Sequence, residues 1–178
     1  MKTKTEQATE RFLSGYNCAQ AVLYAYAPEL GLDGETALKV ATGLGAGMAR
    51  RGEVCGAVTG GIMVLGLKYG RGGRQDRSAT EETYQRTEQL MASFERRHGS
   101  CSCRVLLEGC DLRTANGQQR FREHDLLHKT CVNCVQTVCE LLAGMVEPPT
   151  TQDSRHACAH IEPLRGGRVR NGGTKDPC

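Results

Sequence analysis

GLGAGMARRGEVCGAVTGGIMVLGLKYG, residues 43–70, is the stretch that decides the fold. From Cys55 onward it predicts a helix that is apolar on nearly all sides, although it contains four glycines, Gly56, Gly60, Gly61 and Gly66. Glycine in a helix costs about 1 kcal/mol relative to alanine. We therefore expect a neighbouring backbone or a ligand to approach these positions closely. The stretch predicts a buried central helix with Cys55 at its amino end.

Apolar residues on both sides of this stretch recur at helical spacing, and no run of alternating β-branched residues appears. The pattern predicts helices over 5–13, 16–27 and 78–97, one capped by Asp33, a short one before Cys110 and a last one over 121–143 that Gly144 ends. The predicted fold class is all-α, an irregular bundle of five or six helices around the glycine-rich central helix.

The composition changes after residue 146. The first 146 of the 178 residues suit one helical domain with a core of its own. Residues 147–178 are rich in Pro, Gly and Arg and cannot build a core. They predict a flexible, poorly ordered C-terminal tail.

Charge and hydropathy exclude two classes of partner. The net charge of +3 and the pI of about 8.3 are too mild for a nucleic-acid-binding surface. The longest apolar run, 60–67, is too short to span a bilayer, and the N-terminal residues lack the apolar core of a secretory signal. We expect a soluble cytoplasmic protein that binds neither nucleic acid nor membrane.

Ten cysteines in a chain of this kind need an explanation. In a reducing compartment, metal ligation or thiol redox chemistry is a better one than structural disulfides. Cys18, Cys55, Cys103 and Cys131 each lie at or near the start of an apolar helix stripe. Free N–H groups and the helix dipole favour a thiolate there. If the helices converge, these four sulfurs can hold an iron–sulfur cluster or a zinc ion.

Other interpretations of the cysteines stay open at this point. Cys55 follows Arg50 and Arg51, which favours a reactive thiol of lowered pKa. The CxC pair Cys101/Cys103 and the CxxC pair Cys131/Cys134 can chelate zinc or exchange between dithiol and disulfide. Four further cysteines are expected to be core or tail thiols: Cys110, Cys139, Cys158 and Cys178. The glycine run lacks the Gly-Lys-Ser/Thr ending of a phosphate-binding loop.

A family resemblance rests on four blocks of sequence. Residues 55–60, CGAVTG, match the CGAxxG signature of the C_GCAxxG_C_C family of redox-active proteins, and 43–70 are similar to its central block throughout. Residues 16–22 (YNCAQAV), 99–107 (GSCSCRVLL) and 129–135 (KTCVNCV) resemble its three other cysteine blocks. The resemblance covers about residues 5–145.

This resemblance implies an all-helical domain with four functional cysteines, here Cys18, Cys55, Cys103 and Cys131. It implies redox activity through an iron–sulfur centre and an oxidoreductase as partner. The chain departs from the family pattern in having further cysteines beside the expected third and fourth ligands: Cys101, Cys110, Cys134 and Cys139. Ligand identity at those two positions is therefore left open.

Three hypotheses follow. The leading one is an electron-transfer or redox-sensing protein in which the four cysteines bind a cluster, with [2Fe–2S] favoured, and Gly56 and Gly60 offer backbone N–H groups to the sulfurs. The second is a thiol–disulfide couple with Cys55 as nucleophile and Cys18, Cys103 or Cys131 resolving it. The third is a zinc-stapled module that only binds a partner. Enzymatic activity and homodimer formation are left open.

Overall fold

The computed structural model describes residues 1–73 and 76–146. Within these ranges every regular element is helical, and an isolated bridge between Val54 and Ser102 is the one β-type pairing. The all-α prediction is therefore confirmed. The tail predicted over 147–178 lies outside the described residues.

The elements follow one another as α1 (Lys4–Leu13), α2 (Cys18–Tyr26), η1 (Ala27–Leu30), α3 (Gly34–Ala41), η2 (Thr42–Leu44), α4 (Gly45–Met48), α5 (Gly56–Tyr69), α6 (Ser78–His98), α7 (Cys103–Leu106), α8 (Ala115–Glu123), η3 (Leu127–Cys131) and α9 (Val132–Val146). The first three long helices begin at side-chain caps. Thr3, Asn17 and Asp33 each accept a hydrogen bond from the backbone N–H three residues later. These caps set where the helices start, because they satisfy N–H groups that have no partner within the helix.

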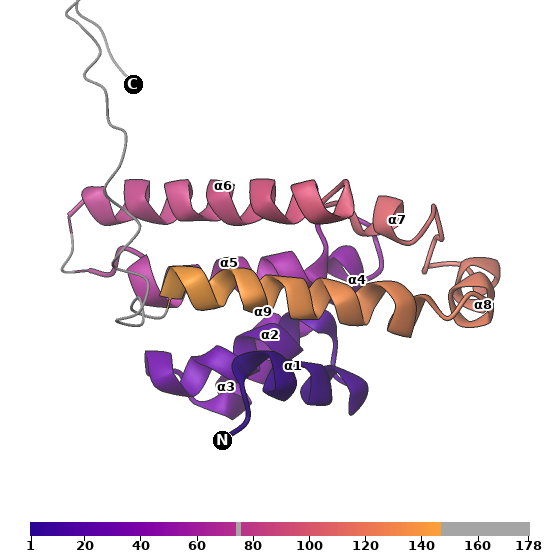
Figure 1. Cartoon of the computed structure of the whole chain (residues 1–178), viewed down its shortest axis with the longest axis horizontal. Coiled ribbons are helices and arrows are strands. Elements are labelled where there is room, and N and C mark those ends of the chain that lie inside the picture. Colours follow the sequence, from indigo (N-terminus) through magenta and orange to yellow (C-terminus); the bar gives the residue numbers. More distant parts are fainter. Residues whose placement is uncertain (74–75, 147–178) are drawn as a thin grey trace, which may run out of the picture. The chain divides into compact units, whose positions relative to one another are not determined.

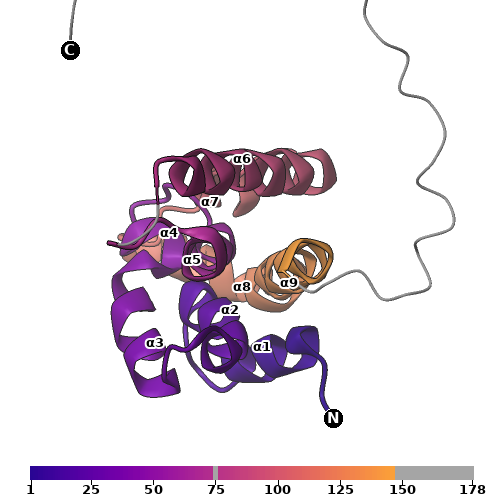
Figure 2. The ribbon, with the colours of Figure 1, turned by 90° about the vertical axis from the view of Figure 1, so that its left-hand side faces the viewer.

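The glycine-rich helix α5 is the centre of the bundle. Viewed end-on, it lies among α2, α6 and α9 (Figure 2). A Cβ at Gly60 would lie 2.8 Å from the carbonyl oxygen of Ala19 in α2, and a Cβ at Gly61 would lie 2.8 Å from Cγ1 of Val138 in α9. The predicted close approach is confirmed at Gly60 and Gly61, and Gly60 brings two backbones together. It is wrong at Gly66, where nothing lies within 4 Å of the position of a Cβ.

The bundle core joins residues from the two ends of the described chain. Tyr26 in α2 is buried, and its hydroxyl donates a hydrogen bond of 2.9 Å to the carbonyl of Cys139 in α9. Leu65, Leu90 and Leu142 are fully buried in the same cluster. α5 and α9 are therefore fixed relative to each other by packing, which matters for the cysteines at their amino ends.

The prediction of a single last helix over 121–143 is wrong. The chain forms α8 instead, breaks at Asp125, whose φ of 52° is left-handed, and passes through the π-helical turn η3 into α9. Thr114 caps α8, because its side chain accepts a hydrogen bond from the N–H of Gly117. Gly117 itself packs against the backbone of Asp111. Gly144 lies inside α9 and does not end it. As a result α7 and α8 lie at the same end of the bundle as α4 (Figure 1).

Candidate functional site

An apolar pocket of about 200 Å³ lies where α2 and α5 begin. Its lining includes the side chains of five cysteines, which come from α2, the residue before α5, α7, η3 and α9: Cys18, Cys55, Cys103, Cys131 and Cys134. The remaining wall is built by Phe12, Asn17, Ala46, Leu107, Leu112, Phe121 and Leu127. No Lys, Arg, His, Asp or Glu is among these lining residues.

All four cysteines singled out from the sequence line this pocket. Cys18 is the first residue of α2, Cys55 is the N-cap of α5, and Cys103 is the first residue of α7. Cys131 ends the π turn η3 and is half-buried, whereas the other three are buried. The fold thus gathers sulfurs that lie up to 113 positions apart in the sequence. Their role as ligands stays a prediction.

The segment between α3 and α5 is fixed onto the start of α2. Asn17, which caps α2, donates from Nδ2 to the carbonyl of Thr42 at 2.9 Å. Gly45 packs so closely on Asn17 that a Cβ there would collide with its side chain. Ala46, which follows Gly45, lines the pocket, and its backbone N–H opposes the rise in the pKa of Cys18 that Cys55 and burial cause. One backbone donor is therefore aimed at the pocket.

This segment continues as a left-handed helical turn, α4. The N–H of Ala49 donates to the carbonyl of Gly45 at 3.0 Å, but five consecutive residues have φ between 52° and 70°: Ala46, Gly47, Met48, Ala49 and Arg50. The left-handed conformation costs roughly 1–2 kcal/mol for each residue with a Cβ. At Gly47 a side chain has no room either, since a Cβ would lie 2.6 Å from that of Cys103.

A short antiparallel pairing aligns Cys55 with Cys103. The N–H of Cys55 donates to the carbonyl of Cys101 at 2.8 Å, and the N–H of Cys103 donates to the carbonyl of Glu53 at 2.7 Å. These bonds flank the bridge between Val54 and Ser102. The amino ends of α5 and α7 are thereby held side by side at the pocket.

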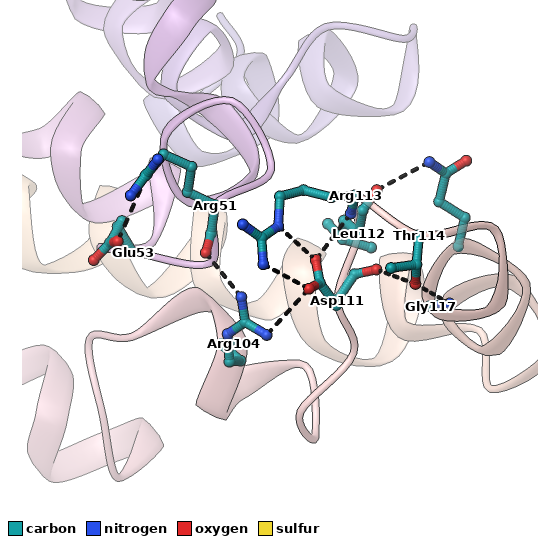
Figure 3. Close-up of polar contacts among 9 residues, drawn as sticks. Arg51, Glu53, Arg104, Asp111, Leu112, Arg113, Thr114 and Gly117 are labelled. Atoms are coloured by element: carbon teal, nitrogen blue, oxygen red, sulfur yellow. Dashed lines mark hydrogen bonds and ion pairs between the residues drawn. The ribbon is translucent and has the colours of Figure 1, made fainter.

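Polar contacts outside the pocket hold α7 in place (Figure 3). Arg104 donates to the carbonyl of Arg51 at 3.0 Å and lies 3.5 Å from the carboxylate of Asp111, which also binds Arg113 at 2.7 Å. Hydrogen bonds from the Arg113 side chain and backbone hold the pKa of Asp111 well below its usual range. The carboxylate therefore stays charged and links the loop after α7 to the loop before α5.

Cys134 is the pocket residue that the sequence analysis did not choose. It lies three residues after Cys131, and this spacing places both side chains on one helix face. Cys134 is buried, with 1% of its surface exposed. The CxxC spacing of Cys131 and Cys134 was the sequence feature that could have identified it. That spacing indicated a local zinc or dithiol pair, and it did not indicate that both cysteines line a pocket shared with distant cysteines.

The remaining described cysteines lie elsewhere. Cys101 points its sulfur toward the carbonyl of Met91 in α6, at 3.7 Å. Cys110 packs with Leu107 and Leu126 in a small second cluster, and Cys139 lies in the main core. At the third family block the structure therefore places Cys103, and not Cys101, at the pocket. The tail residues Cys158 and Cys178 lie outside the described residues.

The expected low pKa of Cys55 is wrong. Its hydrogen bond with Cys134, together with burial, raises its pKa well above the ordinary thiol value. Arg50 and Arg51 are exposed, and Arg51 lies 3.8 Å from Glu53, so neither supplies the positive charge that the sequence suggested.

The other pocket thiols are shifted in the same direction. Hydrogen bonding with Cys55 and burial raise the pKa of Cys18, and burial raises the pKa of Cys103 to about 12. Burial also raises the pKa of Cys131. Without a positive charge in the pocket, these sulfurs are held as neutral thiols.

The two glycines predicted to bind a cofactor have different surroundings. A Cβ at Gly56 would collide with the sulfur of Cys18, so glycine is required for that sulfur to lie where it does. The neighbouring N–H of Ala57 donates to the sulfur of Cys55. Gly60 contacts the backbone of Ala19 and does not line the pocket. Helix packing therefore explains the glycine at this position, which corrects the predicted cofactor-binding role of Gly60.

The arrangement has a defined chemical capacity. Thiolate sulfur is a soft ligand that selects zinc, copper(I) and iron–sulfur clusters. Within residues 1–73 and 76–146, no group of three or more His, Cys, Asp or Glu side chains is placed to hold a metal ion. The five cysteines are thus part of the lining of one pocket without forming such a group.

Comparison with known proteins gives one match. The model of the family described as "Putative redox-active protein (C_GCAxxG_C_C)" matches residues 16–145, which include every pocket residue except Phe12. No curated protein and no solved structure matches the chain. Among the described residues, no helix is both long enough and apolar enough to cross a bilayer.

Proposed function

Since the chain belongs to the C_GCAxxG_C_C family of redox-active proteins, we propose that its pocket is a redox centre that binds an iron–sulfur cluster, with [2Fe–2S] favoured. The observation that carries this proposal is the convergence of five cysteines on one apolar pocket. Cys18, Cys55, Cys103 and Cys131 are the proposed ligands. The cluster would supply one-electron transfer, for electron transport or redox sensing.

The charges of the pocket favour a bound metal over a free reactive thiolate. Its lining carries no cationic side chain, and the pKa values of Cys18, Cys55, Cys103 and Cys131 are all raised. A nucleophilic cysteine needs the opposite environment. Metal ions supply the missing positive charge, because they bind thiolates and displace their protons. The donor set therefore fits a metal centre.

The size of the pocket favours a cluster over a single zinc ion. A structural zinc ion draws four ligands to about 2.0–2.3 Å from one point. In the described residues no three ligand side chains meet in that way, and five cysteines form part of the lining of a pocket of about 200 Å³. A cluster has several metal and sulfide atoms and fills such a space.

The chain's own residues would tune the centre in two ways. Neighbouring thiols and burial raise the pKa values of Cys18 and Cys55, whereas the backbone N–H groups of Ala46 and Ala57 act in the opposite direction and favour the thiolates. Hydrogen bonds to ligand sulfurs and the exclusion of water are two of the levers that set a cluster's reduction potential. Phe12, Leu112 and Phe121 contribute apolar wall that limits solvent access.

We place the proposed electron exchange at the half-buried Cys131, the most exposed of the pocket cysteines. The proposed partner is an oxidoreductase that approaches there. Cytoplasmic location belongs to the same proposal, as the compartment in which these thiols stay reduced.

Anaerobic purification with iron, zinc and acid-labile sulfide analysis tests the proposal. We expect iron and sulfide in equal amounts and a visible absorption band, both lost in Cys18→Ala and Cys103→Ala. The matched control is Cys139→Ala, which removes a buried cysteine outside the pocket and should keep the cluster. Stoichiometric zinc without sulfide would select the zinc-stapled alternative, and a colourless protein after reconstitution would overturn the cluster.

A further inference from the structure

Positive charge is concentrated in the segments that close the pocket, residues 42–55 and 99–131, which we call the rim. These segments supply eight of the twelve residues that line the pocket. They contain seven Lys or Arg and five Asp or Glu, whereas the other described residues contain ten Lys or Arg and eleven Asp or Glu. The excess of positive charge in the described chain therefore lies around the pocket and not on the rest of the bundle.

Three exposed cations lie close to the half-buried Cys131. Phe121 and Cys131 both line the pocket and pack against the same small cluster. Arg120 and Arg122 lie on either side of Phe121 in α8, and Lys129 lies two residues before Cys131. Successive residues of a helix are rotated by about 100°, so the two arginines flank the wall that Phe121 forms. The most exposed pocket cysteine therefore has positive charge next to it.

The ion pairs of the rim leave cations available for a partner. Within residues 1–73 and 76–146, the side chains of Arg50, Arg120 and Arg122 form no ion pair. All five carboxylates of the rim have a partner: Glu53 binds Arg51, Glu108 binds His124, Asp111 binds Arg104 and Arg113, Glu123 binds Gln119, and Asp125 binds His128. The carboxylates are therefore held within the chain, and the free arginines can bind an acidic group from outside.

The rim also exposes an apolar side chain. Val105 in α7 has 62% of its surface exposed, and the residues two positions before and after it, Cys103 and Leu107, line the pocket. Residues two apart lie on roughly opposite sides of a helix, so Val105 lies on the outer face of the pocket wall. Apolar side chains among charged ones are typical of protein interfaces. Nucleic acid needs a more strongly basic face than this mixture of charges. The rim therefore fits a protein partner.

We propose that the rim is the docking surface for an electron-carrier protein whose own face is acidic. The inference rests on the proposed function, because it names the chemistry of the partner that exchanges electrons at Cys131. Arg120, Arg122 and Lys129 attract the acidic face and orient it over that cysteine. Charge complementarity of this kind raises the association rate more than the affinity. The complex should therefore form fast, dissociate fast and weaken as salt screens the charges.

Surface plasmon resonance with immobilised flavodoxin, an acidic electron carrier, tests the docking surface. We expect the full chain to bind it, with an association rate that falls about tenfold or more between about 20 mM and 300 mM NaCl. Cytochrome c, a basic electron carrier, is the matched probe and should bind at least about tenfold more weakly at low salt. Binding of flavodoxin that does not depend on salt would overturn the proposal, as would equally tight binding of a DNA duplex.

Charge-reversal variants locate the surface. Arg120→Glu and Arg122→Glu should each lower the association rate with flavodoxin by about three- to tenfold. The control is Lys68→Glu, which makes the same change of charge at an exposed residue near the carboxyl end of α5, roughly 20 Å along the helix from Cys55. It should change the rate by less than about twofold, and circular dichroism checks the folding of all three variants. An equal loss in Lys68→Glu would mean that only net charge matters and would refute the rim.

Docking and the cluster can fail separately. The docking charges lie on the surface, so flavodoxin binding is measured both on the protein as purified and after metal removal. A protein that binds flavodoxin through Arg120 and Arg122 but never takes up iron and sulfide would keep the docking surface and refute the cluster. A protein that carries the cluster but binds flavodoxin no better than cytochrome c would keep the cluster and refute the docking surface.

Discussion

The bundle around α5 and the rim of the pocket are built on different principles. The bundle, α1, α2, α5, α6 and α9, contains only right-handed helical backbone, and close packing of small and aliphatic residues stabilises it. The rim, residues 42–55 and 99–131, contains every non-glycine residue with positive φ in the described chain: Ala46, Met48, Ala49, Arg50, Glu108 and Asp125. Unfavourable backbone is thus concentrated beside the cysteines.

The difference indicates which part of the molecule is shaped by its site. Sparsely populated backbone conformations persist only where the surrounding structure determines them, and they cluster at functional sites. In the rim they are held by Asn17 on Thr42, by the pairing of Cys55 with Cys101, and by the Arg104–Asp111 contact. The bundle supplies the rigid elements, and the rim brings Cys103 and the N–H of Ala46 to the sulfurs.

Substitution of the bundle glycines should have the largest effect on stability. In Gly60→Ala the new Cβ meets the backbone carbonyl of Ala19 at 2.8 Å, so α2 and α5 must separate. We expect a loss of about 2–3 kcal/mol in the free energy of unfolding. Urea denaturation of the metal-free protein measures it.

Gly61→Ala is the matched comparison for Gly60→Ala. Its Cβ meets side-chain atoms of Val138 and Leu90, which can shift more readily than a backbone carbonyl. The gain in helix propensity partly offsets the strain, and the loss should stay below about 1 kcal/mol. Equal losses for the two variants would show that α2 and α5 are not in close backbone contact.

In the rim, adding a glycine should stabilise the protein. Ala49 is exposed and has a φ of 53°, a conformation that glycine adopts without strain. Ala49→Gly relieves roughly 1–2 kcal/mol of strain and loses about 0.4–1 kcal/mol through the more flexible unfolded chain. We expect urea denaturation to show a net gain of between 0 and about 1.6 kcal/mol in the free energy of unfolding. A loss would mean that residues 46–50 are not left-handed.

The opposite change should stabilise the bundle where a glycine has no close neighbour. Gly66 lies within α5, and nothing stands within 4 Å of the position of a Cβ there. Gly66→Ala should gain about 0.5–1 kcal/mol from helix propensity. Ala49→Gly adds a glycine in the rim and Gly66→Ala removes one in the bundle, and we expect both changes to stabilise the protein. Melting curves that move down for Gly66→Ala would contradict the open surroundings.

The bundle could be predicted from the sequence because its signals are local. Apolar spacing predicted α2 and α6, and Asp33 predicted the start of α3. Each of these helices could therefore be recognised from its own residues. The break at Asp125 was missed because the apolar positions on both sides continue one helical stripe. A left-handed residue without glycine leaves no mark in that pattern.

The site could be predicted only in part, for a related reason. The residue types and the family blocks identified Cys18, Cys55, Cys103 and Cys131, and their convergence depends on tertiary packing that no local pattern encodes. The low pKa expected for Cys55 failed because adjacent arginines in the sequence are exposed in space. Cys134 was missed because its partner, Cys55, lies 79 positions away.

The free energy of unfolding, measured at decreasing pH, should show small effects that differ between a residue of the bundle and a residue of the rim. In the bundle, His98 stacks on Phe94, with ring centroids 4.4 Å apart, and its Nε2 lies 2.9 Å from the hydroxyl of Thr137 in α9. Burial, with a contribution from Arg97, lowers its pKa. The unfolded chain therefore binds a proton at higher pH than the folded one. The contribution of His98 to stability is therefore fully present above the unfolded pKa of about 6.5 and is lost as the pH falls below that value.

In the rim, Asp111 has a lowered pKa for a different reason, the hydrogen bonds from Arg113. Its contribution is present above the unfolded pKa of about 3.9 and is lost as the pH falls below that value. His98→Gln should flatten the pH dependence of unfolding between about pH 7 and 5, and Asp111→Asn only below about pH 4. The effect of His98→Gln should stay below about 1 kcal/mol, because the ring is only partly buried. If His98→Gln leaves the curve above pH 5 unchanged, the ring is solvated and does not join α6 to α9.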